Sequence, residues 1–97
     1  MAITILMKMP LRPDADNIDE VLRHDLPATA EFEGNEGTEV ITDNSEPHTL
    51  YLLSRWSSDD AYEKYSAWRQ SPEGVTRLGE ISSGAPTFRK FHTYMLF

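Results

Sequence analysis

The sequence contains no cysteine, and this absence excludes several classes of function. Without cysteine there is no disulfide framework, no thiolate metal site and no cysteine nucleophile. No apolar run approaches the ~20 residues that cross a bilayer. The opening segment, Met1–Thr4, also lacks the charged-then-apolar layout of a signal peptide. We therefore expect a cytoplasmic protein.

Basic residues are also scarce, because 9 Lys and Arg stand against 16 Asp and Glu in 97 residues, for a net charge of −7. Residues 1–50 hold 3 Lys or Arg and 11 Asp or Glu (net −8), whereas residues 51–97 hold 6 and 5 (net +1). An acidic half repels nucleic-acid phosphates and anionic lipid, so neither nucleic acid nor a membrane is an expected partner. The carboxylates match no Ca²⁺ loop, and we interpret them as a solvated face.

The hydrophobic pattern predicts one domain over residues 1–97 with the element order β-α-β-β-α-β. The strands are expected over residues 3–9, 38–43, 49–56 and 87–97. Asp14 or Asp16 is expected to cap the first helix and Ser57 the second. Pro27 is expected to end or kink the first helix, and Ser71-Pro72 to break the second before a short helical piece over residues 74–82. This order is the ferredoxin-like pattern of an α+β fold with an antiparallel sheet.

Large side chains are expected on both faces of this sheet. In the strand over residues 49–56, Leu50 and Trp56 point one way and Tyr51 and Leu53 the other. Two helices cover one face only, and a contiguous apolar patch left exposed usually marks an interface. We therefore predict a homodimer with a shared sheet-on-sheet core, extended by residues 87–97 reaching the partner.

Aromatic side chains are the most suggestive candidates for a binding site. Trp and Tyr join an apolar body to one polar tip, which suits a pocket for a planar ligand. The alternative is that they only fill the core. The candidates are Tyr51, Trp56, Tyr62, Tyr65 and Trp68.

The three histidines lie far apart and form no ligand pair, so no metal site is expected. His24 is expected to be exposed and His48 to lie at a strand edge. His92, in the middle of the last strand, either accepts a proton near pH 7 or is a hydrogen-bonded barrel residue.

Three stretches, taken with the order of elements, resemble the antibiotic biosynthesis monooxygenase domain family over nearly the whole chain. They are Arg55–Tyr62 (RWSSDDAY), Trp68–Pro72 (WRQSP) and Ser83–Pro86 (SGAP). The resemblance implies a dimeric α/β barrel. It specifies a reaction less closely, because this family includes cofactor-free oxygenases of polycyclic aromatics, quinol oxygenases and haem-degrading enzymes.

The resemblance also implies roles for single positions. In aromatic-oxidising members a Trp at the strand end and a Tyr six residues later line the pocket, and Trp56 and Tyr62 match them. An Asn expected four residues before the Trp is Leu52 here, and Arg77 is only close to an Arg expected in the later helical piece. In haem-degrading members the iron-ligating His would fall at Leu78, whose side chain cannot bind iron. No haem or other cofactor is therefore expected.

These matches lead to the hypothesis of a cofactor-independent monooxygenase-like enzyme that acts on a small aromatic or quinol-type molecule. Tyr62 would donate or relay a hydrogen bond, while Trp56 and Trp68 would stack on the ring. Arg77 or Arg55 would stabilise negative charge. Tyr51, Tyr65 and His92 complete the expected binding residues. The alternative is a non-catalytic dimeric module that binds a hydrophobic ligand or a protein partner.

Overall fold

Strand β1 (Ile3–Pro10) is a central strand of the sheet, and the burial of its side chains alternates from one residue to the next. In the computed structural model, which describes residues 2–97, Ile3, Ile5, Met7 and Met9 of this strand are buried. The intervening Thr4, Leu6 and Lys8 are half-buried or exposed. Because successive side chains of a strand point to opposite faces, one face of the sheet is covered and the other is open.

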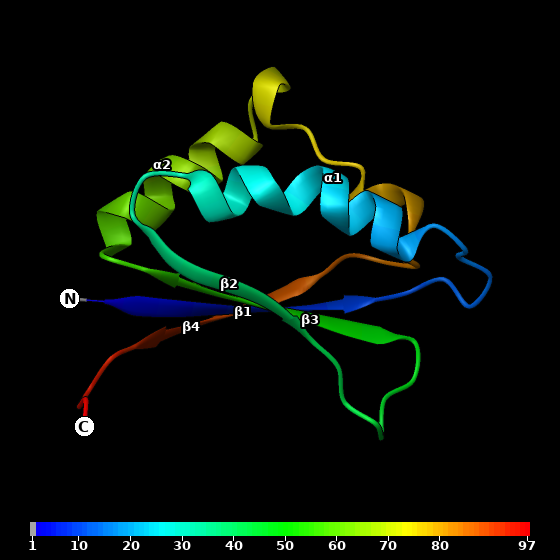
Figure 1. Ribbon diagram of the computed structural model, residues 1–97, viewed down its shortest axis with the longest axis horizontal. Coiled ribbons are helices and arrows are strands. Elements are labelled where there is room, and N and C mark those ends of the chain that lie inside the picture. The colour runs from blue at the N-terminus through cyan, green and yellow to red at the C-terminus, as the bar shows by residue number, and fades with distance from the viewer. Residues whose placement is uncertain (1) are drawn as a thin grey trace.

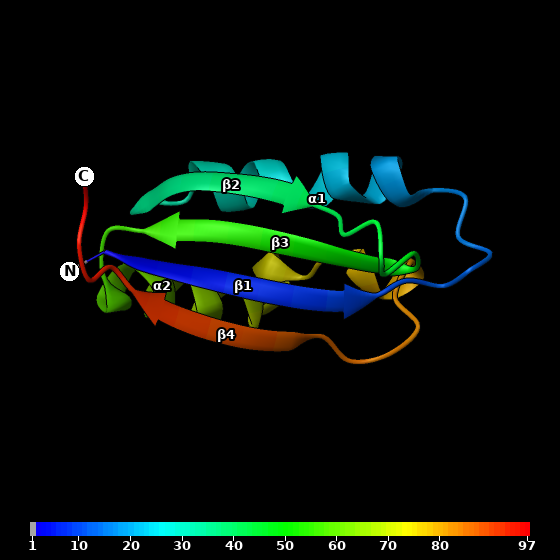
Figure 2. The same cartoon turned by 90° about the horizontal axis from the view of Figure 1, so that it is seen from below.

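Four strands form one antiparallel sheet in the order β2-β3-β1-β4 (Figure 2). They are β1, β2 (Asn35–Ile41), β3 (Thr49–Trp56) and β4 (Thr87–His92). The expectation that β4 continues to residue 97 is wrong. His92 pairs with Ile3, the first residue of β1, so the chain after Thr93 has no strand beside it among the described residues. The α+β, ferredoxin-like architecture is confirmed.

All helical segments lie on the same side of the sheet (Figure 1). They are α1 (Ile18–Glu31), α2 (Asp59–Arg69) and two short 3₁₀ turns, η1 (Pro72–Gly74) and η2 (Leu78–Glu80). Within residues 2–97, neither α1 nor α2 combines the length and the hydrophobicity that crossing a bilayer requires.

The helix starts differ from the expected ones by a few residues. Asn17, not Asp14 or Asp16, precedes the first turn of α1. Ser58, not Ser57, caps α2, since its Oγ accepts the Ala61 backbone N–H at 3.1 Å.

The expectation that Pro27 ends the first helix is wrong, because α1 continues through it to Glu31. A proline costs a helix one backbone hydrogen bond and crowds the preceding turn. The turn after Pro27 is held by tertiary bonds instead: Thr29 is buried and its hydroxyl is bonded to side chains of α2. Tertiary contacts here outweigh the local preference.

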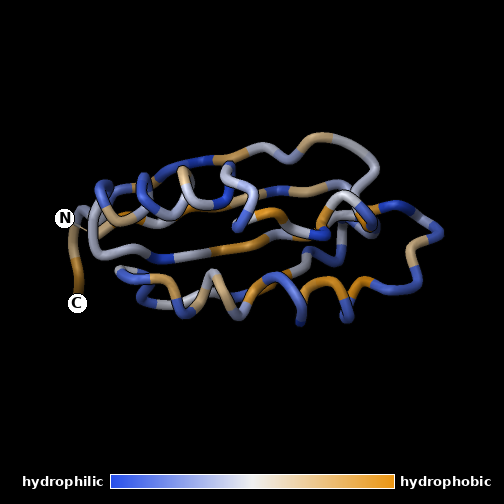
Figure 3. Tube along the Cα trace, turned by 90° about the horizontal axis from the view of Figure 1, so that it is seen from above, coloured by the Kyte–Doolittle hydropathy of each residue, from blue (hydrophilic) through white to orange (hydrophobic). Residues whose placement is uncertain are grey.

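Two clusters of buried side chains form the core under the helices. The aliphatic cluster joins the second half of β1 to α1 and the segment after η2, through Met7, Met9, Val21, Leu50 and Ile81. The aromatic cluster joins the first half of β1 to α2, through Ile3, Ile5 and Trp56 with Phe32, Tyr62 and Tyr65 packed around them. Figure 3 shows α1 alternating between hydrophobic and hydrophilic residues, as a helix packed on one face must.

The open face carries a mixed surface with an apolar centre. Leu6 pairs with Leu53 in the middle of the sheet, and Ile41 and Phe91 on the outer strands remain 40% and 41% exposed. The strand register places charged side chains around them: Lys8, Glu39, Arg55 and Arg89. This face lies on the viewer's side in Figure 2, with the helices behind it.

Candidate functional site

A cavity of about 490 Å³ lies between the covered face of the sheet and the two helices. Its floor is formed by Ile5, Met7, Leu52 and Ser54, and its mouth is bordered by residues 84–86 and Phe88. Helix α1 contributes Asp25, Leu26 and Thr29, and α2 contributes Tyr62, Tyr65, Ser66, Arg69 and Gln70. The volume falls within the ~300–1,000 Å³ typical of small-molecule sites.

The sequence-predicted residues divide into three groups. Tyr62 and Tyr65 line the cavity, one helical turn apart on α2. Trp56, Trp68, Arg77 and His92 lie on the same side of the sheet but do not line it. Tyr51 and Arg55 lie on the open face, because they pair with Lys8 and Thr4 of β1.

Trp56 belongs to the core. Its side chain is 0% exposed, and its indole N–H donates to Ser54 Oγ at 3.0 Å. Trp68 is half-buried behind the cavity wall, with its ring 5.5 Å from Phe32 and 6.3 Å from Tyr65, centre to centre. Both indoles therefore support the wall and do not face the cavity.

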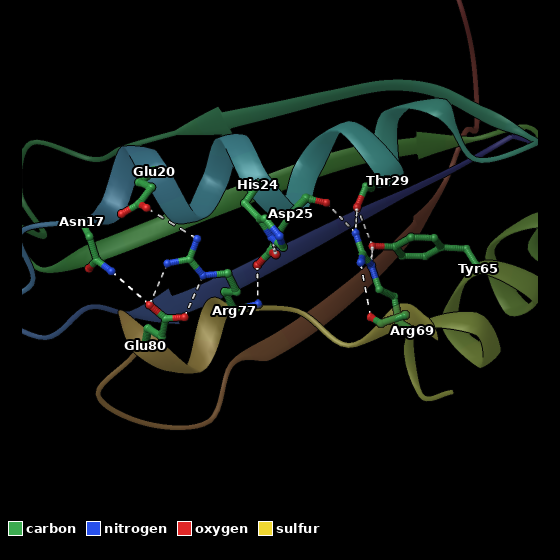
Figure 4. Close-up of polar contacts among 10 residues, drawn as sticks. Asn17, Glu20, His24, Asp25, Thr29, Tyr65, Arg69, Arg77 and Glu80 are labelled. Atoms are coloured by element: carbon green, nitrogen blue, oxygen red, sulfur yellow. Dashed lines mark hydrogen bonds and ion pairs between the residues drawn. The ribbon is translucent and has the colours of Figure 1, made fainter. Parts of the chain in front are cut away.

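The charged candidates are engaged elsewhere. Arg77 forms an ion pair with Glu80 at 2.8 Å and lies 3.7 Å from Glu20, on the surface beside η2 (Figure 4). His92, at the end of β4, is exposed and contacts Asp59 at 3.1 Å. On the open face, the Tyr51 hydroxyl donates to Glu46. The structure does not bring these groups to the cavity.

Tyr62 presents an uncommitted polar tip to the cavity. Burial raises the pKa of its phenol above the ordinary value of about 10, with smaller contributions from Tyr65 and Glu63. The phenol is therefore neutral near pH 7 and acts as a hydrogen-bond donor. Within residues 2–97, the tyrosine hydroxyls that form hydrogen bonds are those of Tyr51 and Tyr65, not that of Tyr62. The hydroxyl is thus available to a ligand.

Sequence reasoning missed Thr29 of α1 and Arg69 of α2, which join the expected Tyr65 in a polar cluster of the cavity lining (Figure 4). The Tyr65 hydroxyl shares a hydrogen bond with Thr29 Oγ1 at 2.7 Å and accepts one from Arg69 Nε at 2.8 Å. Arg69 Nη2 donates to Thr29 Oγ1 at 2.6 Å and to the Asp25 carbonyl at 2.8 Å, while Nη1 donates to the Gly74 carbonyl at 3.3 Å. This cluster ties α2 to α1 and to η1.

Asp25 is the other ionisable residue of the lining that the sequence reasoning passed over. Its side chain is only 1% exposed. Oδ1 lies 2.8 Å from His24 Nδ1, and Oδ2 accepts the backbone N–H of Arg77 at 2.8 Å. The carboxylate therefore points away from the cavity and fixes the segment that leads into η2.

The sequence did contain a signal for these residues. Val21, Asp25 and Thr29 are spaced four apart and share the buried stripe of α1 with Leu22 and Leu26. A polar residue on an apolar stripe needs a buried partner. Tyr65 and Arg69, also four apart on α2, provide that partner for Thr29.

The arrangement is an apolar chamber with a few hydrogen-bond donors, suited to a planar ligand that carries oxygen. Leu52 and Leu78, at positions where relatives are expected to carry polar or metal-binding residues, both line it with aliphatic carbon. Within residues 2–97, no three His, Asp or Glu side chains are grouped to hold a metal ion.

Comparisons with known proteins identify the sequence family and the fold. Residues 1–94 match the family described as Antibiotic biosynthesis monooxygenase. Among curated protein sequences, none matches this chain.

Solved structures resemble the whole chain at low identity. Rv0793 from Mycobacterium tuberculosis superposes with a TM-score of 0.77 at 17% identity, over 99% of this chain and 98% of that one. A putative antibiotic biosynthesis monooxygenase from Nitrosomonas europaea gives 0.79 at 9% identity, over 96% and 90%. SnoaB, a cofactor-independent oxygenase from Streptomyces nogalater, gives 0.75 at 12% identity, over 98% and 95%. At such identities the likeness is one of fold.

Proposed function

This chain belongs to the antibiotic biosynthesis monooxygenase family, and we propose that it is a cofactor-independent oxygenase of a small aromatic or quinol-type molecule. The observation that carries the proposal is the apolar cavity of about 490 Å³ with the free Tyr62 hydroxyl in its wall. A cofactor-independent oxygenase with the same fold, SnoaB, supports this choice within a family of mixed functions.

Such a reaction requires little of the protein beyond a dry pocket and well-placed donors. An activated phenol or quinol that loses a proton becomes an anion, and this anion reduces O₂ directly. One oxygen atom enters the substrate and the other leaves as water, so the substrate supplies all the electrons. The protein accelerates the reaction by stabilising the anion more strongly than the neutral substrate.

Tyr62 is the residue to which we assign a role in the reaction. Its neutral phenol can donate a hydrogen bond to the oxygen on which negative charge develops. The floor beneath it is mostly apolar, since Ile5 and Leu52 offer no hydrogen bond and Ser54 Oγ already accepts one from the Trp56 indole. Such a surface suits the face of an aromatic ring.

Oxygen consumption tests this proposal. Anthrone and 1,4-naphthohydroquinone serve as substrates, in buffer with a chelator, and each rate is corrected for autoxidation. We expect Tyr62→Phe to lower kcat/KM by about 10–100-fold, the worth of one transition-state hydrogen bond. Tyr94→Phe is the matched control, because Tyr94 is 92% exposed on the C-terminal segment. No enzyme-dependent oxygen uptake with any such substrate would favour the alternative, a non-catalytic ligand-binding module.

We further infer that two copies pair through their open sheet faces. The apolar centre formed by Leu6, Ile41, Leu53 and Phe91 has no cover within residues 2–97. The rim of this face carries charges of both signs, negative at Glu39 and positive at Arg55 and Arg89. Such a surface is complementary to a second copy of itself turned about a two-fold axis. A stable monomer by light scattering at micromolar concentration would contradict this assembly.

A further inference from the structure

We propose that Arg69, Tyr65 and Thr29 form an anion-binding site, so that the cavity selects planar apolar ligands carrying an ionised oxygen. The proposal rests on the cavity of the proposed function and names the class of molecule that this cavity binds. It concerns binding alone and requires no oxidation.

The polar hydrogens of this cluster outnumber the hydrogen-bond acceptors available to them. A guanidinium has five N–H groups, and the four hydrogen bonds of Arg69 leave one N–H on Nη1 without an acceptor among residues 2–97. The hydroxyl oxygens of Thr29 and Tyr65 both accept from Arg69, and a single hydrogen lies between them. One of the two hydroxyls therefore has a hydrogen left to donate. The cluster offers surplus donors and lacks an acceptor.

The charge of Arg69 is likewise not neutralised by its partners. All four acceptors are neutral: two backbone carbonyls and two hydroxyls. The aromatic rings of Tyr65 and Trp68, 5.3 and 4.8 Å from the guanidinium carbon, contribute cation–π contacts but no negative charge. A half-buried cation with neutral partners favours an anion nearby.

Asp25 does not take the place of that anion. It and Arg69 are the two charged residues of the lining. Both carboxylate oxygens of Asp25 are bonded to groups on the other side, His24 and the Arg77 N–H, and the side chain is almost fully covered. Arg69 contacts only the backbone carbonyl of Asp25 (Figure 4). The cavity therefore has a positive polar wall and an apolar floor.

A ligand that matches both surfaces has a flat ring and an anionic oxygen at one edge. An ionised ring hydroxyl and a ring carboxylate share this chemistry. The ring would lie on Ile5, Met7 and Leu52, with the oxygen toward Arg69. A neutral analogue of the same shape would leave the surplus donors desolvated and unsatisfied.

Isothermal titration calorimetry with matched probes tests the site. At neutral pH, 2-hydroxy-1,4-naphthoquinone is an anion, whereas 2-methoxy-1,4-naphthoquinone is neutral and nearly the same shape. We expect the anion to bind about 10–100-fold more tightly, the range of one charge-assisted hydrogen bond. A second pair, 2-naphthoate and 2-naphthamide, shows whether a carboxylate is accepted as well as a ring oxygen. Both quinone probes are already oxidised, so the outcome does not depend on oxygenase activity.

The substitution Arg69→Met should remove most of the preference for the anion while the methoxy probe binds as before. Arg23→Met is the control, because Arg23 is exposed on α1 and does not line the cavity. If Arg69→Met fails to fold, Arg69→Gln decides the question, since it keeps amide donors at this position and removes the positive charge; a loss of preference of about threefold or more is then expected. Equal affinity of wild-type protein for the two quinones, or a preference unchanged in the folded variant, would overturn the proposal.

Discussion

The two faces of the sheet are formed by the same strands but differ in how far their side chains are buried. On the covered face, Ile3, Met9 and Trp56 are fully buried by helices of the same chain. On the open face, Leu6 and Leu53 occupy the same central strands and stay half-buried, and Phe91 remains exposed. The alternation of side chains along β1 therefore produces one face that helices of the same chain cover and one apolar face that a second molecule would have to cover. The cavity lies on the covered face, so folding and ligand binding depend on the same side chains.

The largest expected effect is on the covered face. Trp56→Ala removes a fully buried ring and should lower the free energy of unfolding by about 3–5 kcal/mol. Trp68→Ala should cost clearly less, because Trp68 is only half-buried and removes less area from water when the chain folds. Urea unfolding followed by circular dichroism gives both values. Equal losses in the free energy of unfolding would contradict the distinction between Trp56 as a core residue and Trp68 as a support of the cavity wall.

A smaller effect on folding, but a large one on assembly, is expected on the open face. Leu53→Asp would place an unpaired charge at the centre of the proposed sheet-on-sheet interface. We expect the dimer dissociation constant to rise at least about 100-fold while the far-ultraviolet circular dichroism spectrum is retained. Analytical ultracentrifugation measures this constant. Glu73→Gln, exposed on η1 and on the opposite side of the sheet, is the control. A dimer unaffected by Leu53→Asp would refute the proposed pairing.

The smallest effect is expected at the edge between the faces, where exposed charges link β4 to α2. Hydrogen bonds from Lys90 and then His92 lower the pKa of Asp59. A lowered folded-state pKa contributes stability above the unfolded-state value, about 3.9, and this contribution is lost as the pH falls through the folded-state value. Asp59→Asn should therefore be slightly less stable than wild type at pH 7, and the difference should shrink as the pH falls below the unfolded-state value. Thermal melts across that range measure it; a difference that grows in acid would contradict the assignment.

Much of the fold could be predicted from the sequence because it depends on periodicity. The strand over Thr49–Trp56 has the expected bounds, and the order of elements is as expected. The errors lie where tertiary contacts decide. The buried Thr29 holds α1 together beyond Pro27, and the absence of a partner for residues after Thr93 ends β4 early.

Less of the site could be predicted, and for a physical reason. Tyr62 and Tyr65 line the cavity, but the same aromatic pattern also described Trp56, which is core. Spacing places Tyr51 and Arg55 on the opposite face of the strand from Trp56, but it does not show which face the helices cover, and residue type alone grouped all three as pocket candidates. Arg69 became recognisable only when α1 and α2 were placed side by side.

The most direct test of the central claim, that the covered face binds ligand and the open face binds protein, is an amide ¹H–¹⁵N spectrum titrated with 2-hydroxy-1,4-naphthoquinone. We expect the shift changes to cluster at the cavity, on Thr29, Ser54, Tyr62, Ser66 and Arg69. Leu6, Leu53 and Phe91 on the open face should keep their positions. Changes centred on those three residues, or no change at saturating ligand, would contradict it.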